Sequence, residues 1–325
     1  MRTVFLGSPP FATPILERLV QGANRPIAVV TQPERPRGRG RKALPSPVAE
    51  IARREGIELL TPEKATDPGF LDRLRALEPD VLFVVAYGKI LREDLLSIPR
   101  ITSLNVHPSL LPRHRGATPI PAALLAGDET TGVTIQKVSA ELDAGDVLCT
   151  VETPIDETEH AGELAARLAE LSAELSERAL ALVAGGEATY TPQDDSQATY
   201  CGKLEKGDGE IDWAKDAPEL VRHVRGMTPW PGARTTLPDG SELTVLRARA
   251  TAGAGRPGEV LEASRRFVVA CDGARSDGAL ELQEVKPAGK RRMSGQDFLR
   301  GARFEAGLLL GGRPGAGGDG GGDTP

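Results

Sequence analysis

The sequence predicts a doubly wound, mostly parallel α/β sheet followed by a small β-rich domain. In the first 186 residues, short apolar runs alternate with amphipathic segments, which is the order typical of βαβ units. Beyond residue 206, short β-type runs are separated by Gly, Pro and Asp, which is typical of a small barrel or sandwich. The length of 325 residues also favours two domains.

The expected elements of the first domain follow from hydrophobic periodicity. A buried strand at 3–7 ends at GSPP, and a helix begins near Phe11, as at the opening of a Rossmann unit. This turn lacks the G-x-G-x-x-G spacing, so a dinucleotide site is not favoured. The other expected elements are strand 27–31, helix 47–55, strand 57–60, helix 69–77, strand 80–86, a strand ending near 106, strand 133–138 and helix 162–184.

The segment between residues 31 and 47 is predicted to be an irregular loop, because prolines and glycines interrupt it. Its basic residues, against the single acid Glu34, are Arg35, Arg37, Arg39, Arg41 and Lys42. A solvated loop is the ordinary interpretation. We favour an arm that grips phosphates, because guanidinium groups fit phosphate oxygens and long loops frequently carry function.

Three polar residues form a candidate catalytic site. An apolar run at 101–106 predicts a buried strand that stops at His107-Pro108, because proline cannot continue a ladder. Asn105 and His107 then lie at the edge where ligands bind in open α/β sheets. Asp143 follows the strand at 133–138, so an amide, an imidazole and a carboxylate are predicted to meet there. Ordinary capping of strand ends is the alternative.

Other kinds of site find less support. Ser109 lies near His107, but the chain has no G-x-S-x-G elbow. His114 and His160 give no recognisable metal-ligand spacing, so no metal is expected. The cysteines are odd in number and far apart, which matches neither a disulfide framework nor a zinc site and fits a reducing cytoplasm. They are Cys149, Cys201 and Cys271.

The composition and charge of the chain limit the classes of protein to which it could belong. No apolar run approaches the length of about twenty residues that a membrane span needs, and the first residues do not resemble a targeting segment. The net charge of −6 argues against wholesale nucleic-acid binding. The charge is uneven, because residues 206–310 carry 17 Lys and Arg against 15 Asp and Glu. Local basic clusters therefore remain possible there.

The expected domain boundaries follow from changes in sequence texture. The helix at 162–184 has leucines on one side and stops at Gly185-Gly186, so a first domain of residues 1–186 is expected. Residues 187–206 show no period and are expected to form a linker to a second domain at 207–310. Its expected elements are a helix at 217–226 and strands at 235–237, 243–248, 258–261, 267–270 and 280–285. The Gly-rich tail 311–325 is expected to be disordered.

Several motifs resemble those of the folate-dependent formyltransferases, and most closely of the members that act on initiator tRNA. The run NVHPSLLP at 105–112, followed by LDAGD at 142–146, resembles their signature. Further matching segments are TQP at 31–33, VAYG at 85–88, RHRGA at 113–117, TGVTI at 131–135, IDW at 211–213, PWP at 229–231 and KPAGK at 286–290. The resemblance runs from Thr3 to about Gly301. Departures from the family pattern are Pro10, Thr102, His114 and the tail.

The resemblance implies a Rossmann-like formyltransferase domain followed by an OB-like β-barrel. It implies transfer of a formyl group from 10-formyltetrahydrofolate to the α-amine of methionine on initiator tRNA. Asn105 and a protonated His107 would donate to the tetrahedral oxyanion. Asp143 would polarise His107 and take the proton from the amine. A neighbouring carboxylate favours imidazolium, so the last two groups are expected to titrate as a pair.

The resemblance also implies the binding residues. The folate pocket would be lined by Ser109, Leu110, Leu111 and Pro112, with Tyr87, Gly88 and Ile90 near the pterin ring. Besides the basic loop, the residues implied to face tRNA are Lys286, Lys290, Arg291, Arg292, Arg300 and Arg303. We expect a monomer. The rivals are a formyltransferase of the same fold acting on an amino sugar nucleotide or a purine precursor, and a non-catalytic RNA-binding relative.

Overall fold

A computed structural model describes residues 1–37, 42–272, 278–302 and 304–311. The chain divides into two compact units, each formed from more than one segment. Unit 1 comprises Met1–Ile120, Glu129–Ile155 and Glu163–Gly202. Unit 2 comprises Pro121–Asp128, Asp156–Gly162 and Lys203–Pro325. Within the described ranges, no helix is both long enough and apolar enough to cross a membrane.

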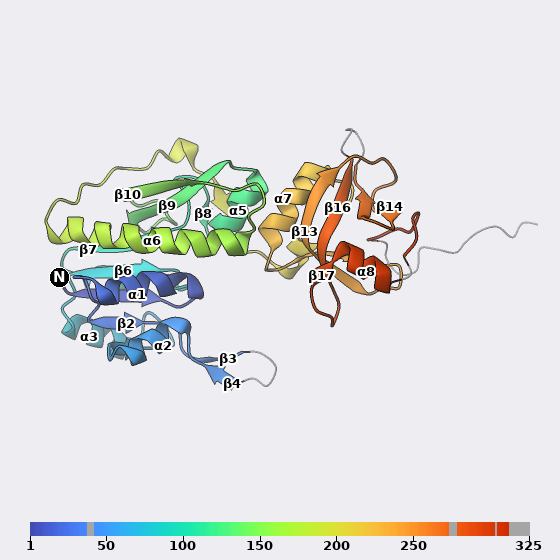
Figure 1. Cartoon of the computed structure of the whole chain (residues 1–325). Helices are drawn as coiled ribbons and strands as arrows, with labels where there is room; N and C mark the ends of the chain where they lie inside the picture. The colour runs from blue at the N-terminus through green and yellow to red at the C-terminus, as the bar shows by residue number, and fades with distance from the viewer. Residues whose placement is uncertain (38–41, 273–277, 303, 312–325) are drawn as a thin grey trace, which may run out of the picture. The chain divides into compact units, whose positions relative to one another are not determined.

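Unit 1 is built on a seven-stranded sheet in the order β10-β9-β7-β6-β1-β2-β5 (Figure 1). These strands are β1 (Thr3–Gly7), β2 (Ala28–Val30), β5 (Glu58–Leu60), β6 (Val81–Val85), β7 (Thr102–His107), β9 (Thr130–Lys137) and β10 (Val147–Pro154). The strands from β7 to β5 are parallel, while β9 is antiparallel to both of its neighbours. The predicted mostly parallel, doubly wound sheet is confirmed.

Helices cover both faces of this sheet. The helices of unit 1 are α1 (Thr13–Gln21), α2 (Pro47–Arg54), α3 (Pro68–Ala76), α4 (Glu93–Leu96) and α6 (Ala161–Ala184), with a 3-10 turn at Pro10–Ala12. Val4 and Leu6 pack with Leu74 of α3, which covers one face. Phe5 points the other way because side chains alternate along a strand. The helix α1 covers that face. It forms one ion pair with α2 (Arg54–Glu17) and one with α6 (Arg18–Glu177).

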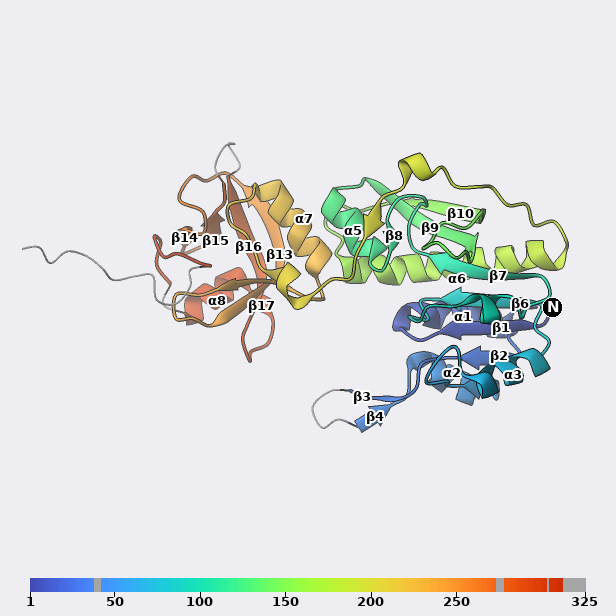
Figure 2. The same ribbon diagram turned by 180° about the vertical axis from the view of Figure 1, so that it is seen from behind.

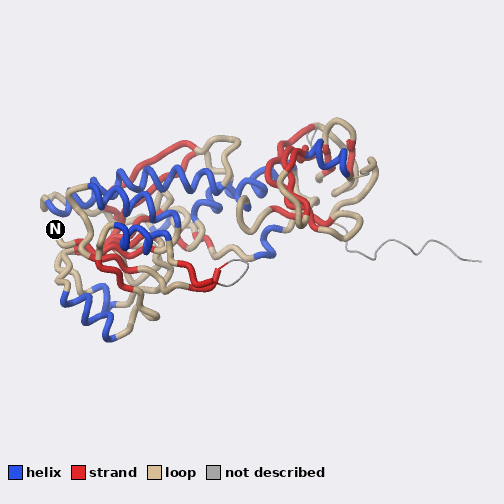
Figure 3. Tube along the Cα trace, turned by 60° about the horizontal axis from the view of Figure 1, so that its bottom comes forward, coloured by secondary structure: helices blue, strands red, loops and turns tan. Residues whose placement is uncertain are grey.

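The structure corrects two expectations about unit 1. The segment 31–47 is not irregular throughout, because β3 (Arg35–Arg37) and β4 (Lys42–Leu44) pair as an antiparallel ribbon (Figure 3). Proline is tolerated in a two-stranded ribbon, where only alternate residues need their N–H for the partner strand. Ile101 does not belong to the buried strand either. It precedes β7 and is 55% exposed.

Residues 187–202, called the strap below, run back over unit 1 after α6 (Figure 2). Thr191 bridges Val147 at the start of β10. The 3-10 turn Asp195–Gln197 follows, and β11 (Tyr200–Cys201) then pairs in parallel with β8 (Arg115–Gly116). Most of the stretch expected to be a linker is therefore hydrogen-bonded to unit 1.

Unit 2 contains an antiparallel sheet in the order β12-β13-β16-β15-β14, as expected for a small β-rich domain. The strands are β12 (Ala233–Thr236), β13 (Glu242–Thr251), β14 (Val260–Ala263), β15 (Phe267–Ala270), β16 (Ala279–Pro287) and β17 (Met293–Ser294), which pairs with β16. The helices are α7 (Ala217–Met227), α8 (Gly295–Gly301) and most of α5 (Pro119–Ala126), with a 3-10 turn at Lys206–Gly209. Trp213, Leu220 and Phe267 are among the residues of its core.

Candidate active site

The strand β7 carries Asn105 and His107 to the edge of the sheet at which the parallel strands end. It pairs with β6 on one side and with β9 on the other. In the second pairing Asn105 lies opposite Gln136, so the two side chains share one face of the sheet. The strand stops at His107, before Pro108, as the sequence predicts.

Asp143 comes from the loop between β9 and β10, and the backbone of this loop is tightly constrained. Asp143 has a φ of 51°, a left-handed conformation that is uncommon for a residue other than glycine. Two residues later, a Cβ on Gly145 would lie 1.9 Å from the carbonyl oxygen of Lys137. Only glycine fits there, and this close approach turns the loop back towards the sheet.

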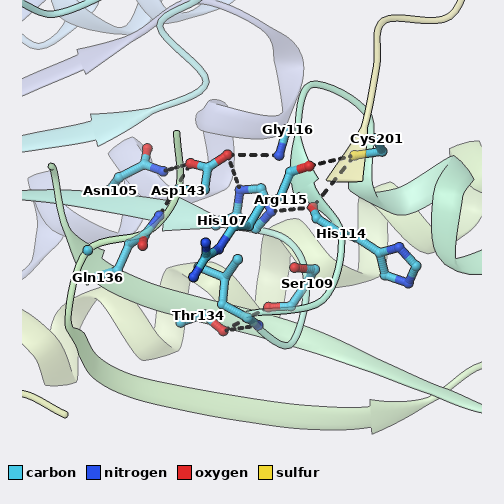
Figure 4. Close-up of polar contacts among 12 residues, drawn as sticks. Asn105, His107, Ser109, His114, Arg115, Gly116, Thr134, Gln136, Asp143 and Cys201 are labelled. Atoms are coloured by element: carbon cyan, nitrogen blue, oxygen red, sulfur yellow. Dashed lines mark hydrogen bonds and ion pairs between the residues drawn. The ribbon is translucent and has the colours of Figure 1, made fainter. Parts of the chain in front are cut away.

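Four groups surround the Asp143 carboxylate (Figure 4). Its Oδ1 accepts hydrogen bonds from Asn105 Nδ2 at 3.4 Å and from Gln136 Nε2 at 3.3 Å. Its Oδ2 accepts from the Gly116 backbone N–H at 2.9 Å and lies 3.6 Å from His107 Nδ1. The amide, the imidazole and the carboxylate proposed from the sequence therefore meet at one end of the sheet.

His107 is held by its second ring nitrogen. Nε2 lies 2.9 Å from the carbonyl oxygen of His114, so this nitrogen carries a hydrogen and donates it. The second proton, when present, belongs on Nδ1, which faces Asp143. The ring is only 4% exposed, and burial lowers the pKa of His107, although the Asp143 carboxylate and the His114 carbonyl act in the opposite direction.

Burial therefore opposes the protonated form of His107 that the family resemblance implies, and that protonated form stays a prediction. A carboxylate at 3.6 Å is beyond ordinary hydrogen-bonding distance, and it does not offset the cost of burying a charged ring. Both ring nitrogens of His107 also face protein groups. Asp143 is thus the titratable group that faces Nδ1 of this histidine.

The SLLP segment forms a turn that is fixed to β9. Thr134 Oγ1 donates to the carbonyl of Ser109 at 2.8 Å and accepts from the N–H of Leu111 at 3.2 Å. The Ser109 hydroxyl is buried and donates to the Arg113 carbonyl at 2.6 Å. Leu110, Leu111 and Pro112 are half-buried, and the Leu111–Pro112 peptide bond is cis.

The residues predicted to lie near the pterin ring differ in their surroundings. The Tyr87 side chain is buried in the core beneath α3, and burial raises its pKa to about 12. Gly88 has a φ of 77°, whereas Ile90 is 85% exposed. A cavity of about 220 Å³ lies at this sheet edge. Its lining is not made of the predicted folate residues and consists of Ser8, Pro9, Gln32, Pro33, Leu44, Ser46 and Ala86.

The predicted tRNA-binding residues fall in two places. In unit 1, the backbone of Arg35, Arg37 and Lys42 lies in β3 and β4, whereas Arg39 and Arg41 lie outside the described residues. In unit 2, the exposed residues at and beyond the end of β16 are Lys286, Lys290, Arg291 and Arg292. Arg300 is exposed on α8, while Arg303 and the tail from residue 312 also lie outside the described residues.

Sequence reasoning missed three residues of the site. Gln136 is a 1% exposed amide that directly follows the buried Val133 to Ile135 run of β9, which is a detectable signal. The role of Gly116 depends on its N–H, which no side-chain pattern reveals. Gln193 lies in the aperiodic stretch that was expected to be a linker, and no local feature of the sequence marks it.

The fold and the trio suit a group-transfer enzyme that acts at a carbonyl carbon, and the comparisons identify the class. A model of the formyl transferase family matches residues 1–180, and a model of the formyl transferase C-terminal domain matches residues 203–303. A relative from Methylococcus capsulatus is 45% identical over 96% of this chain and 100% of its own length. One from Citrifermentans bemidjiense is 43% identical over 96% of each chain.

Both relatives are named methionyl-tRNA formyltransferase, and this chain belongs to that family. Solved structures with lower identity share its fold. An N-formyltransferase from Helicobacter canadensis, in complex with folinic acid and dTDP-3-aminofucose, has a TM-score of 0.64 at 15% identity and covers 87% of this chain and 98% of its own. HypX from Aquifex aeolicus, in complex with tetrahydrofolic acid, has a TM-score of 0.60 at 20% identity. The match with HypX covers 92% of this chain and 47% of HypX.

Proposed function

We propose that the protein transfers the formyl group of 10-formyltetrahydrofolate to the α-amine of methionyl initiator tRNA, in the cytoplasm. The similarity to methionyl-tRNA formyltransferases over nearly the whole chain carries this proposal. The convergence of Asn105, His107 and Asp143 supports it, because these groups suit attack on a carbonyl carbon. An amino sugar nucleotide is not favoured as the acceptor.

In the proposed reaction, the amine lone pair forms a bond to the formyl carbon and places negative charge on the formyl oxygen. Asn105 Nδ2 is the donor we assign to this oxyanion, because its 3.4 Å contact with Asp143 is long and easily exchanged. The bond from carbon to N10 of the folate then breaks. The proton released by the amine ends on N10, so a group at the site must accept it and return it.

Asp143 and His107 are the groups we assign to this proton relay. The carboxylate takes the proton from the amine directly or through water. Because Nε2 of His107 is fixed on a carbonyl oxygen, Nδ1 is the ring position that exchanges a proton with Asp143. This pairing lets the site take up one proton and become neutral overall while it holds that proton.

The binding surfaces are also part of the proposal. Leu110, Leu111 and the exposed Ile90 offer apolar surface to the folate, whereas Tyr87 has a buried side chain and offers its backbone only. The β3–β4 ribbon with its basic loop and the lysines and arginines at 286–292 are proposed to contact tRNA phosphates. Three free cysteines fit a reducing cytoplasm.

The test is formyl transfer to charged initiator tRNA with an amino sugar nucleotide as competing acceptor. The wild type is expected to formylate the tRNA. Asn105→Ala is expected to lower kcat by about a hundred- to a thousand-fold, because one oxyanion donor is lost. Transfer to the sugar alone, or an Asn105→Ala variant of normal activity, would overturn the assignment.

A further inference from the structure

The Asp143 loop is anchored by a residue of the strap. Gln193 Nε2 donates to the carbonyl oxygens of Asp143 at 2.9 Å and Gly145 at 2.8 Å. It also lies 2.9 Å from Oε1 of Gln136, as a donor. One amide nitrogen thus faces three acceptors, all of which belong to the loop that carries the carboxylate or to the strand beside it.

The other end of the same amide is held by a buried arginine. Gln193 Oε1 accepts from Arg115 Nε at 3.1 Å and Nη2 at 2.8 Å. Arg115 is 1% exposed and also bonds to Asp195 at 2.6 Å and to the Tyr200 hydroxyl at 3.4 Å, both on the strap. The arginine fork fixes which end of the Gln193 amide faces Asp143, because guanidinium can only donate.

The orientation of the Gln193 amide also determines which atoms face the Asp143 carboxylate. Gln193 bonds to the oxygen of the Gln136 amide, so the nitrogen of that amide is the atom left facing Asp143 Oδ1. On the other side, Gly116 directly follows Arg115 and donates its N–H to Asp143 Oδ2. Both carboxylate oxygens are therefore held by donors whose position depends on the pair of Gln193 and Arg115.

We infer that Gln193 and Arg115 are positioning residues for formyl transfer, which set the direction of the Asp143 carboxylate towards the amine. This inference rests on the proposed function and adds the strap to the active site. Neither residue is assigned contact with a substrate. Their effect is on kcat, because a misplacement of about 1 Å at a reacting group costs about a hundred-fold in rate.

The alternative is that the pair only stabilises the fold, and two substitutions separate these roles. Gln193→Ala removes both ends of the amide. Gln193→Glu keeps an acceptor for the Arg115 fork, and so keeps the side chain bound to the arginine. It removes the donor that faces Asp143, Gly145 and Gln136. Gln197→Ala is the matched control, because it removes the same side chain from an exposed position of the same strap.

The experiment measures kcat and KM for methionyl initiator tRNA and for 10-formyltetrahydrofolate, with melting temperatures, on the full chain. We expect Gln193→Ala and Gln193→Glu to lower kcat by about ten- to a hundred-fold with both KM values within about twofold. Gln193→Glu is expected to melt a few degrees below the wild type, because one carboxylate oxygen faces three acceptors while the other keeps the Arg115 contact. Gln197→Ala is expected to behave as the wild type.

An unchanged kcat in Gln193→Glu would overturn the inference, whether or not Gln193→Ala folds. So would a rise in either KM that accounts for the loss of activity, or a loss of activity explained by unfolding. Failure of the proposed function is distinguishable, because the wild type itself would then transfer no formyl group to the tRNA.

Discussion

Gly116→Ala is a sharp test of the site, because the added methyl group has no room. The new Cβ would lie 2.1 Å from the carbonyl oxygen of Cys201, and real Cβ atoms essentially never approach a heavy atom closer than 3.0 Å. The β8 and β11 backbones must therefore separate by about 0.9 Å. This displacement breaks the bond from Ala117 N–H to the Cys201 oxygen, now 3.1 Å long, and moves the N–H that donates to Asp143.

The expected costs follow from this displacement. A φ of 124° is strained for alanine by about 1–3 kcal/mol, and a lost hydrogen bond adds about 1 kcal/mol. We expect the free energy of unfolding of unit 1 to fall by about 2–4 kcal/mol in urea, followed by circular dichroism. We also expect kcat for formyl transfer to fall about a hundred-fold.

The control is Gly56→Ala, at a glycine of unit 1 with a φ of 65° and no atom within 4 Å of the point where a Cβ would lie. It carries the conformational strain without the collision, so a loss of about 1 kcal/mol and an unchanged kcat are expected. A Gly116→Ala variant with kcat within about threefold of the wild type would refute the reasoning, because the contact with Asp143 would then not govern the rate.

Three further predictions concern binding and unit 2. Arg39→Ala is expected to raise KM for the tRNA several-fold and to spare folate binding; an equal loss of folate affinity would contradict this. Burial lowers the pKa of His223 below 6.5, so its imidazole stays neutral in the folded unit at pH values at which it binds a proton in the unfolded chain. The contribution of neutral His223 to the free energy of unfolding is then fully present above pH 6.5. Below pH 6.5 the free energy of unfolding decreases by up to about 1.4 kcal/mol for each pH unit. His223→Gln should flatten this slope in urea titrations at pH 7.5 and 5.5 followed by tryptophan fluorescence, and equal slopes would count against it. Thr235→Val removes the acceptor for the buried Trp213 N–H, now at 3.0 Å, and should cost about 1–3 kcal/mol in the same assay; no loss would show that water replaces the hydroxyl.

Local pattern predicts the strands and the trio because each depends on neighbouring residues. The buried strands are short apolar runs, and β7 stops where Pro108 cannot continue the ladder. The strands and the end of β7 are consequences of periodicity and of proline chemistry. Asp143 is marked by its position after the strand at 133–138 and by the resemblance of LDAGD to a family motif, whereas the strand order that places it beside Asn105 comes from the structure.

What the sequence did not predict depends on contacts between distant segments. Gln193 meets Gln136 across 57 residues and Arg115 across 78, and no periodicity encodes either pairing. The downward direction of the His107 pKa depends on how deeply the fold buries the ring, which a neighbouring carboxylate alone does not reveal. Sequence reasoning missed the β3–β4 ribbon, because the rule that proline excludes strands holds for central strands only.

The position of the strap in the chain determines when the active site can be completed during synthesis. Gln193 lies 50 residues after Asp143, so a ribosome makes the whole carboxylate loop and the long helix α6 before the anchor exists. A nascent chain, or a fragment cut at the glycine pair 185–186, holds the trio without the amide that aims it. We expect such a product to fold much of the sheet but to leave the carboxylate loop unanchored, so the site is complete only after synthesis has passed Gln193.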